Sequence, residues 1–261
     1  IRLKIEALSS EGSGVGRFEG ITVFVDNTAP GDEITAHIIK VKSSYAVGKL
    51  SELTVPSPDR IHADCPVFMQ CGGCAYRHIS YESEKRWKQK KVRDSLERIG
   101  HIRLEPDEII GAESTERYRN KAQYPVGTDR DGRLTAGFYS RKSHRTVCCD
   151  DCLLQPESFK KTVDTVKHWG DLNGVTAYNE QTHEGLLRHI YIRCGFHTGE
   201  TMVCLVINGT KIPEADRLVR ELLVELGEDP DREGLRKTPT RVARSLSYLT
   251  RGYRQNLKAV V

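Results

Sequence analysis

Short runs of apolar residues, partly alternating with polar ones, fill the first quarter of the chain and predict β-strands. These runs cover residues 1–8, 21–25, 34–41 and 45–53. The glycine- and serine-rich stretch at residues 9–16 is interpreted as a loop. Several short strands in so few residues predict a small closed β-barrel of the OB type at residues 1–57.

A helical period replaces this pattern in the middle of the chain. A linker is predicted at Pro56–Pro58. A strongly basic helix is then predicted from about Ser80 to Gly100, because glycine suits the position just after a helix end. A second helix should follow Pro156, because proline is favoured in the first helical turn. One face of that second helix carries Phe159, Val163, Val166 and Trp169.

Strands are expected on both sides of the second helix. They are predicted at residues 118–126, 134–139, 188–194 and 201–208. Asp131-Gly132 is a strong hairpin signal between the first two of them. This mixture predicts an α+β domain at residues 115–220, preceded by a connecting segment at residues 58–114.

The last part of the chain is predicted to be helical. Its first apolar stripe consists of Leu218, Leu222, Leu223 and Leu226. A final helix should begin at Thr238, a good N-cap, and end at Gly252. The predicted fold class is therefore multidomain, β plus α+β: a barrel, an α+β domain and a helical tail at residues 221–261.

Composition limits the possible functions only weakly. The 261 residues include 40 Lys and Arg against 36 Asp and Glu, a net charge of +4. A basic surface for nucleic acid would therefore be a local patch. No run approaches the ~20 apolar residues of a membrane helix, and no secretory signal is recognised. We expect a cytoplasmic protein with reduced thiols and no membrane partner.

Three of the eight cysteines lie in one short segment. Cys65, Cys71 and Cys74 are separated by five and then two residues, with Gly72 and Gly73 inside the segment. Closely spaced thiols in a reduced setting indicate a metal centre. The glycines allow backbone N–H groups to approach sulfur. A fourth ligand would have to come from a distant segment.

Cys149 and Cys152 form a second C-x-x-C pair, so a zinc ribbon is an alternative. The gap between the pairs is longer than the ~15–20 residues usual for such ribbons, and Cys65 would have no role. Three thiols plus one remote cysteine favour an iron–sulfur cluster over zinc, and purely structural thiols are a third interpretation. Cys194 and Cys204 lie in apolar runs and are interpreted as core residues.

Several motifs follow one another along most of the chain. The motifs are Cys65-x5-Cys-Gly-Gly-Cys74 followed by Tyr76-Arg-His-Ile-Ser-Tyr81, Tyr118-Arg-Asn-Lys-Ala-Gln-Tyr-Pro125, Gly137-Phe-Tyr with Ser143-His, Asp151-Cys152-Leu-Leu-Gln155, Leu187-Arg-His-Ile190, Thr198-Gly-Glu200, and Leu205-Val-Ile-Asn-Gly209. Together they resemble a known family, the RNA uracil-5 methyltransferases, and the resemblance runs from residue 1 to about residue 220. Members use S-adenosylmethionine to make 5-methyluridine in ribosomal or transfer RNA.

The resemblance implies a fold and a ligand set. Residues 1–57 would be a TRAM domain, a small RNA-binding barrel. By the resemblance, a [4Fe–4S] cluster would be held by Cys65, Cys71, Cys74 and Cys152. Cys148 and Cys149 do not match the family pattern. RNA would be the partner, no obligatory protein partner is implied, and S-adenosylmethionine would be the cofactor of the full-length enzyme.

Eight residues are candidates for RNA contacts. The alternative for each is an ordinary surface charge or a side chain that pairs across a sheet. The candidates are Lys4, Arg17, Lys42, Arg119, Lys121, Tyr124, Arg188 and His189.

The chain also departs from the family pattern. Methylation at C5 needs a thiolate nucleophile, a base and a held methyl donor. The family's Gly-rich cofactor loop and its cysteine near a Pro-Pro-Arg motif are not found after Asn208-Gly209. We therefore assign no catalytic residue, leave enzymatic activity open, and expect the Rossmann-like methyltransferase domain to be absent.

The tail resembles a different family. Residues 221–253 are similar to the N-terminal helices of GTP cyclohydrolase I, without that enzyme's zinc-binding residues. Three hypotheses follow. The chain is the RNA-binding, cluster-bearing part of an RNA methyltransferase, the first part of a fusion that ends in GTP cyclohydrolase I, or a zinc-binding RNA adaptor.

Overall fold

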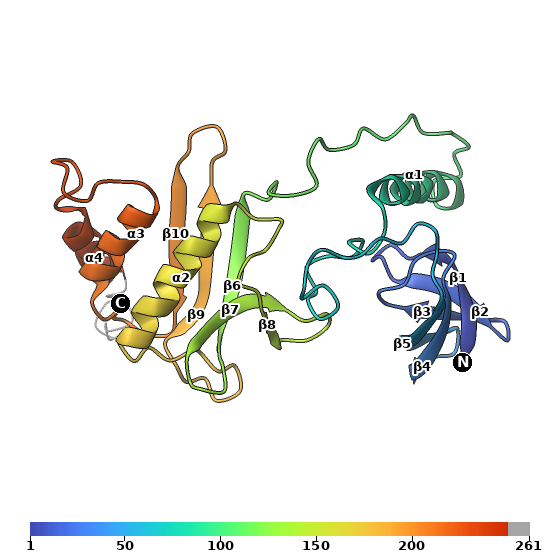
Figure 1. Ribbon diagram of the computed structural model, residues 1–261, viewed down its shortest axis with the longest axis horizontal. Helices are drawn as coiled ribbons and strands as arrows, with labels where there is room; N and C mark the ends of the chain where they lie inside the picture. The colour runs from blue at the N-terminus through green and yellow to red at the C-terminus, as the bar shows by residue number, and fades with distance from the viewer. Residues whose placement is uncertain (250–261) are drawn as a thin grey trace, which may run out of the picture. The chain divides into compact units, whose positions relative to one another are not determined.

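The computed structural model describes residues 1–249, in two units, Ile1–Glu113 and Ser114–Val261 (Figure 1). The helix end expected at Gly252 lies outside the described residues.

Five strands of the first unit close into a barrel, in the order β1-β2-β3-β5-β4 (Figure 1). The strands are β1 (Arg2–Leu8), β2 (Gly14–Phe18), β3 (Ile21–Val25), β4 (Glu33–Val41) and β5 (Tyr45–Val55). β3 and β5 are parallel, and the other neighbours are antiparallel. The small closed barrel predicted from the sequence is confirmed.

The barrel encloses an apolar core made by one face of each strand. Buried and exposed residues alternate along β1, as expected for a strand with one face against a core. Because the sheet is closed, it has no edge strand with unpaired backbone groups. The buried residues of this core are Leu3, Ile5, Val23, Val25, Ile34, Ala36 and Ala46.

β2 was not predicted, because its glycines were interpreted as a loop. In the barrel these glycines are positions where neighbouring groups come close. A Cβ on Gly14 would lie 1.9 Å from Thr28 Oγ1, and one on Gly16 would lie 2.4 Å from the Lys4 carbonyl oxygen. Glycine here reflects close packing inside a strand.

The basic helix α1 (Tyr81–Arg98) begins as predicted, with Ser80 as its N-cap. The Ser80 side chain accepts a hydrogen bond from the Ser83 N–H at 3.2 Å. Its apolar positions are not covered, since Val92 is 51% and Ile99 is 80% exposed. Ser83, in the first turn, is the buried residue of the helix, and the later turns contact the rest of the unit through exposed or partly buried polar side chains such as Gln89 and Lys91.

The second unit contains an antiparallel sheet in the order β10-β9-β6-β7-β8. Its first strand starts three residues later than predicted, while Leu134–Tyr139 matches the prediction. The three-residue strand β8 was not predicted. The strands are β6 (Lys121–Thr128), β7 (Leu134–Tyr139), β8 (Thr146–Cys148), β9 (Leu187–Cys194) and β10 (Thr201–Ile207).

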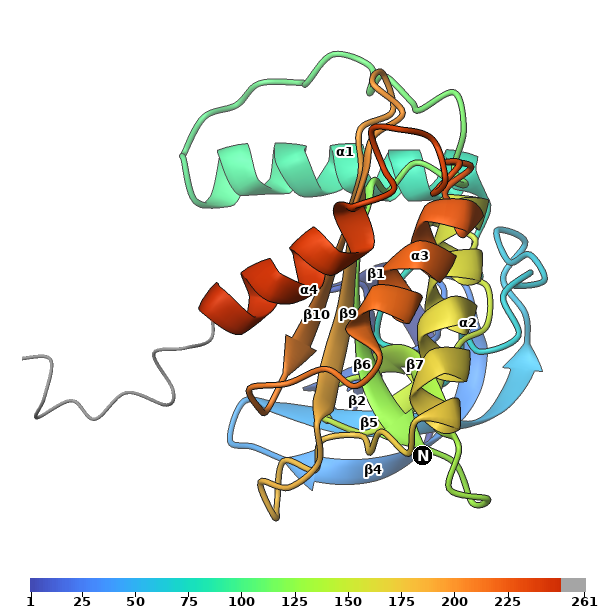
Figure 2. The same cartoon turned by 90° about the vertical axis from the view of Figure 1, so that its left-hand side faces the viewer.

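Helix α2 (Glu157–Leu172) covers one face of this sheet (Figures 1 and 2). The four apolar residues predicted to share a face, Phe159, Val163, Val166 and Trp169, are all buried. Trp169 donates its indole N–H to the Pro213 carbonyl oxygen at 3.0 Å, so its polar atom is satisfied. The predicted amphipathic helix is confirmed.

Helices α3 (Ala215–Glu225) and α4 (Thr238–Leu249) follow the sheet (Figure 2). Leu218 of α3 is buried in the core of the second unit, and Leu222 packs against it. The Thr240 hydroxyl donates to the Asp216 carboxylate at 3.2 Å and joins the two helices. Within residues 1–249, every helix is too short or too polar to cross a membrane.

We predict that Gly16→Ala destabilises the barrel by about 1–3 kcal/mol, the usual cost of overpacking. The added methyl would collide with the Lys4 carbonyl and, at 2.8 Å, with Leu3 Cδ1. Urea unfolding measures the change, with Ser10→Ala at an exposed position as the control. An unchanged unfolding midpoint for Gly16→Ala would contradict the close packing of β2.

Candidate functional site

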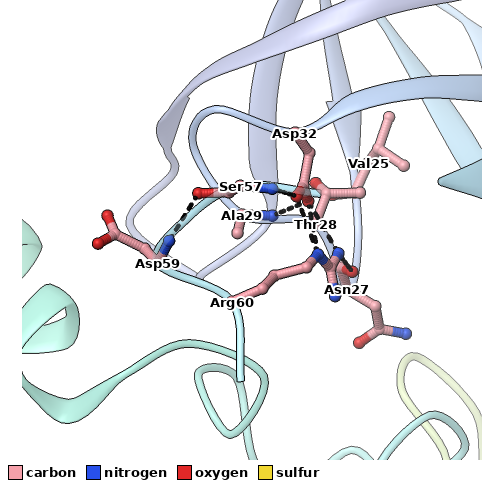
Figure 3. A network of polar contacts seen from close by, with 8 residues as sticks. All are labelled: Val25, Asn27, Thr28, Ala29, Asp32, Ser57, Asp59 and Arg60. Atoms are coloured by element: carbon pink, nitrogen blue, oxygen red, sulfur yellow. Dashed lines mark hydrogen bonds and ion pairs between the residues drawn. The ribbon is translucent and has the colours of Figure 1, made fainter. Parts of the chain in front are cut away.

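A buried ion pair fixes the chain where it leaves the barrel. The Asp32 side chain is 0% exposed and that of Arg60 is 17% exposed. Arg60 donates from Nε to Asp32 Oδ1 at 2.9 Å and from Nη2 to Oδ2 at 2.8 Å, a bidentate fork. Figure 3 shows this arrangement, in which Arg60 also donates from Nη2 to the Asn27 carbonyl oxygen at 2.9 Å.

Backbone groups complete the coordination of the Asp32 carboxylate. The Ala29 N–H donates to Oδ2 at 2.6 Å and the Ser57 N–H donates to Oδ1 at 2.8 Å (Figure 3). A buried carboxylate is tolerated when it is both paired and hydrogen-bonded, as here. Neither Asp32 nor Arg60 was singled out from the sequence.

Asp59 connects the same linker to α1. Its carboxylate accepts from the Ser83 hydroxyl at 2.9 Å and from Arg86 Nη2 at 2.7 Å. Its carbonyl oxygen accepts from the Ser80 N–H at 2.9 Å, at the start of the helix. The linker therefore holds both the barrel and the first turn of α1.

The three closely spaced thiols lie in a loop whose two ends are joined. Arg60 and Ile79 form an antiparallel bridge, and the Ile61 N–H donates to the His78 carbonyl oxygen at 3.1 Å. Phe68 is buried inside the loop, with its ring centroid 5.4 Å from that of His78. The thiol loop, residues 61–78, is thus a folded unit with its own small core.

Turns within this loop position the cysteines. The Phe68 N–H donates to the Cys65 carbonyl oxygen at 3.1 Å, and the Cys71 N–H donates to the Val67 carbonyl oxygen at 2.8 Å. The Gly73 N–H donates to Cys71 Sγ at 3.3 Å, which is the N–H···S approach expected from the glycine pair. Cys65, Cys71 and Cys74 are all partly exposed.

Cys152 belongs to the second unit, between β8 and α2. Its carbonyl oxygen accepts from the Gln155 N–H at 2.8 Å and from Arg117 Nη1 at 3.3 Å. Arg117 also forms a bidentate pair with Asp151, with both N···O distances at 2.7 Å. The segment that carries Cys152 is therefore held by Arg117.

The four predicted cluster ligands come from both units, three from the first and Cys152 from the second. Across residues 1–249, no group of three or more His, Cys, Asp or Glu side chains has the arrangement of a metal site. The assignment of the four cysteines stays a prediction. Of the cysteines outside it, Cys148 is exposed and Cys149 is buried.

The predicted RNA contacts on the barrel are at its surface. Arg17 and Lys42 are exposed. Lys4 is also exposed, and its Nζ lies 3.8 Å from Glu33 Oε1 in a surface ion pair. These positions are compatible with RNA contacts and equally with ordinary solvated charges.

The predicted RNA contacts in the second unit have different environments. Arg119 and Lys121 are exposed, and Arg188 stacks on Tyr178 with Cζ 4.3 Å from the ring centroid. His189 lies near the Tyr139 hydroxyl, with 3.4 Å between Nε2 and the oxygen. Burial and then the Arg188 cation lower the pKa of His189, which favours the neutral imidazole.

Tyr124 is not a surface residue, which corrects its assignment as an RNA contact. It lies in the core of the second unit, with its ring centroid 5.0 Å from that of Phe138. Burial raises the pKa of its phenol, and nearby Cys152 and Cys149 add to the shift. Alternation along β6 places Tyr124 on the same face as Ala122 and Val126, toward the core.

The basic residues of α1 are largely neutralised by neighbouring acids. This pairing favours the interpretation of the basic run as an ordinary solvated helix face. The ion pairs are Lys85–Glu82, Arg86–Asp59, Lys88–Glu84, Lys90–Asp94 and Arg93–Glu105.

Comparison with known proteins shows what the barrel resembles. The family model described as "TRAM domain" matches residues 1–51. The barrel is therefore similar to a TRAM domain. At the other end of the chain, the family model described as "GTP cyclohydrolase I" matches residues 215–261.

Curated relatives are similar to most of this chain. A protein of Halalkalibacterium halodurans named "uncharacterized RNA methyltransferase" is 42% identical over 223 residues, 85% of this chain and 48% of its own length. A Clostridium tetani protein with the same description is 38% identical over 224 residues, 86% of this chain and 48% of its own. The chain thus spans about half the length of the curated relatives it matches.

A solved structure shares the fold. It is the crystal structure of Pyrococcus abyssi tRNA (uracil-54, C5)-methyltransferase in complex with S-adenosyl-L-homocysteine. The match has a TM-score of 0.63 and 23% sequence identity, and it covers 83% of this chain and 48% of the enzyme chain. The expectation that the methyltransferase fold is absent is therefore wrong: most of the chain shares the fold of such an enzyme.

That error has a physical origin. The expectation relied on two motifs, a Gly-rich cofactor loop and a cysteine near Pro-Pro-Arg, which carry chemistry. A fold is determined by the apolar pattern and the strand register, so it can be shared by sequences that differ in such motifs. A fold comparison detects the arrangement of strands and helices, such as the barrel and the five-stranded sheet, and does not depend on those motifs.

We predict that Asp32→Ala destabilises the first unit by about 3–5 kcal/mol, because it leaves a partly buried guanidinium and two backbone N–H groups without an acceptor. Thermal or urea unfolding measures the loss. Asp107→Ala, which removes an exposed acid from the same unit, is the control. Equal stability of the two variants would show that the ion pair does not hold the linker.

Proposed function

We propose that this chain binds RNA and acts in an RNA methyltransferase that makes 5-methyluridine in ribosomal or transfer RNA with S-adenosylmethionine. The similarity to relatives named RNA methyltransferases, over 85% of this chain in the first of them, carries the proposal. The barrel adds support, because TRAM-like and OB-type barrels present open surfaces to nucleic acid. The solved enzyme with the same fold holds S-adenosyl-L-homocysteine.

RNA would be held first through its phosphates. On the barrel the proposed contacts are Lys4, Arg17 and Lys42, whose exposed cations can approach a strand without rearrangement. In the second unit they are Arg119, Lys121, Arg188 and His189. The cysteines of the thiol loop are reduced thiols, which supports a location in the cytoplasm.

We also propose that Cys65, Cys71, Cys74 and Cys152 hold a [4Fe–4S] cluster. The donor set fits this group, since it offers four thiols and a Gly73 N–H that already donates to Cys71 Sγ. When bound, the cluster would supply a four-thiolate cross-link between the thiol loop and the segment before α2. A zinc ion on the same thiols is the competing assignment.

The match of residues 215–261 to GTP cyclohydrolase I supports a second candidate, a fusion with that activity. It predicts consumption of GTP by the protein that contains this chain. If GTP is not consumed and RNA is bound, only the first candidate stands.

Anaerobically purified protein should contain about four iron and four sulfide ions per chain. Cys71→Ser and Cys152→Ser should each lose most of the iron, because each removes one thiolate of the set. Cys148→Ser, which changes an exposed cysteine four residues from Cys152, is the matched control and should retain it. Zinc without sulfide, or iron retained in Cys152→Ser, would contradict the assignment.

RNA binding should weaken as salt rises. Arg17→Ala should reduce the slope of log K against log salt by about 0.7, the value for one lost phosphate contact on a single strand. Lys161→Ala, an exposed cation on α2, should leave the slope unchanged. Affinity for uridine-rich RNA that does not respond to salt would exclude phosphate contacts.

A further inference from the structure

Among the described residues of the second unit, no helix packs on one of the two faces of its sheet. α2 packs on the opposite face, as both views show (Figures 1 and 2). Residues that pair across β6, β9 and β10 point to the same side of the sheet. Three such rows form what we call the open face: Lys121–Arg193–Met202, Gln123–Tyr191–Cys204 and Pro125–His189–Val206. Pro125, at the β6 end of the last row, is buried.

The first row places two cations directly opposite each other. Lys121 pairs with Arg193 in the register of β6 and β9, and both side chains are exposed. Within residues 1–249, neither cation has an acidic partner. Like charges opposite each other in a sheet are destabilising, so this row is suited to an anion between or above them.

Aromatic and apolar side chains lie beside these cations on the open face. Tyr191 lies in the middle row, and Lys121 Nζ is 5.9 Å from its ring centroid. Met202 is 50% and Val206 is 36% exposed, on the strand next to it. Cys204, predicted to be a core residue, is also exposed here, because β10 is covered on one face only. Flat apolar and aromatic surface next to cations is typical of sites that stack bases.

Arg188 adds a third cation beside the last row. Arg188 has no partner residue on β10, because His189 pairs with Val206 and Leu187 pairs with Ile207. Its guanidinium stacks on Tyr178, whose hydroxyl lies 2.9 Å from His183 Nδ1. Arg188 Nε is buried without an acceptor, a state that costs free energy unless a ligand supplies one.

The nearby acid does not neutralise this cation. Glu180 Oε2 lies 2.9 Å from His144 Nδ1, and both residues are exposed. The ring of Tyr139 is 5.3 Å from that of His144 and approaches His189 on the open face. Arg188 therefore presents a cation that is stacked on one aromatic ring, with a buried Nε that has no acceptor.

We propose that the open face, together with Arg188, is a platform for single-stranded RNA. Bases would stack on Tyr191 and the apolar side chains, while phosphates would lie near Lys121 and Arg193 at one end and Arg188 at the other. From His189 to Arg193, four residue steps along β9, the three rows span about 13 Å, enough for more than one nucleotide. Unpaired bases suit this surface, because duplex RNA does not expose base faces. This inference rests on the proposed RNA binding and specifies its surface and strand state.

Fluorescence anisotropy with a short uridine-rich single strand tests the platform. Tyr191→Ala should weaken binding about 5- to 100-fold, the range for loss of one stacked base, and Tyr191→Phe should stay within about twofold of the wild type. The double variant K121A/R193A, at exposed positions, should also weaken binding and reduce its salt dependence. Lys161→Ala, on the helix-covered side, is the matched control.

A duplex of the same sequence separates stacking from charge. Its affinity should be lower than that of the single strand and should not change in Tyr191→Ala. If the wild type binds the strand but Tyr191→Ala and K121A/R193A bind equally well, the platform is wrong and the open face serves another partner, such as protein. If the wild type binds no RNA, the proposed function itself fails.

Discussion

The pairing of Asp32 with Arg60 is the interaction on which the arrangement of the first unit depends. A carboxylate taken out of water needs every acceptor site occupied, and the Asp32 side chain accepts from Arg60, Ala29 and Ser57. These donors come from the β3–β4 connection and from the linker after β5. The chain leaves the barrel in one direction, and both the thiol loop and α1 start from that fixed point.

The balance of charge differs between the surfaces of the protein. On α1 the cations are matched by acids on the same helix or close by, so the helix carries little net field. On the open face Lys121 and Arg193 have no such match among the described residues. The helix has more cations than the open face, but those of the open face are left without acidic partners in the described part of the chain, and only the three-dimensional arrangement shows this difference.

Elements whose residues interact locally were predictable from the sequence. The face of α2 follows from four apolar residues at helical spacing, and β7 from its alternation and the preceding turn. The pairing of Asp32 with Arg60 links residues 28 positions apart, and no local pattern encodes it. β2 was missed because glycine marks both loops and close strand packing. Buried Ile190 and Ile192 alternate with partly exposed Tyr191 and exposed Arg193 along β9, so this alternation was available in the sequence as a signal.

The two sheets also differ in how they end. The barrel closes on itself, whereas β10 lies at the border of the second sheet with one side of its backbone unpaired by neighbouring strands of that sheet. Its seven residues, Thr201–Ile207, include no charge, proline or glycine. Such a segment has the composition of self-associating β-structure. Local opening around β10 would give this chain its strongest tendency to aggregate, and a bound polyanion beside it would oppose that tendency by keeping molecules apart.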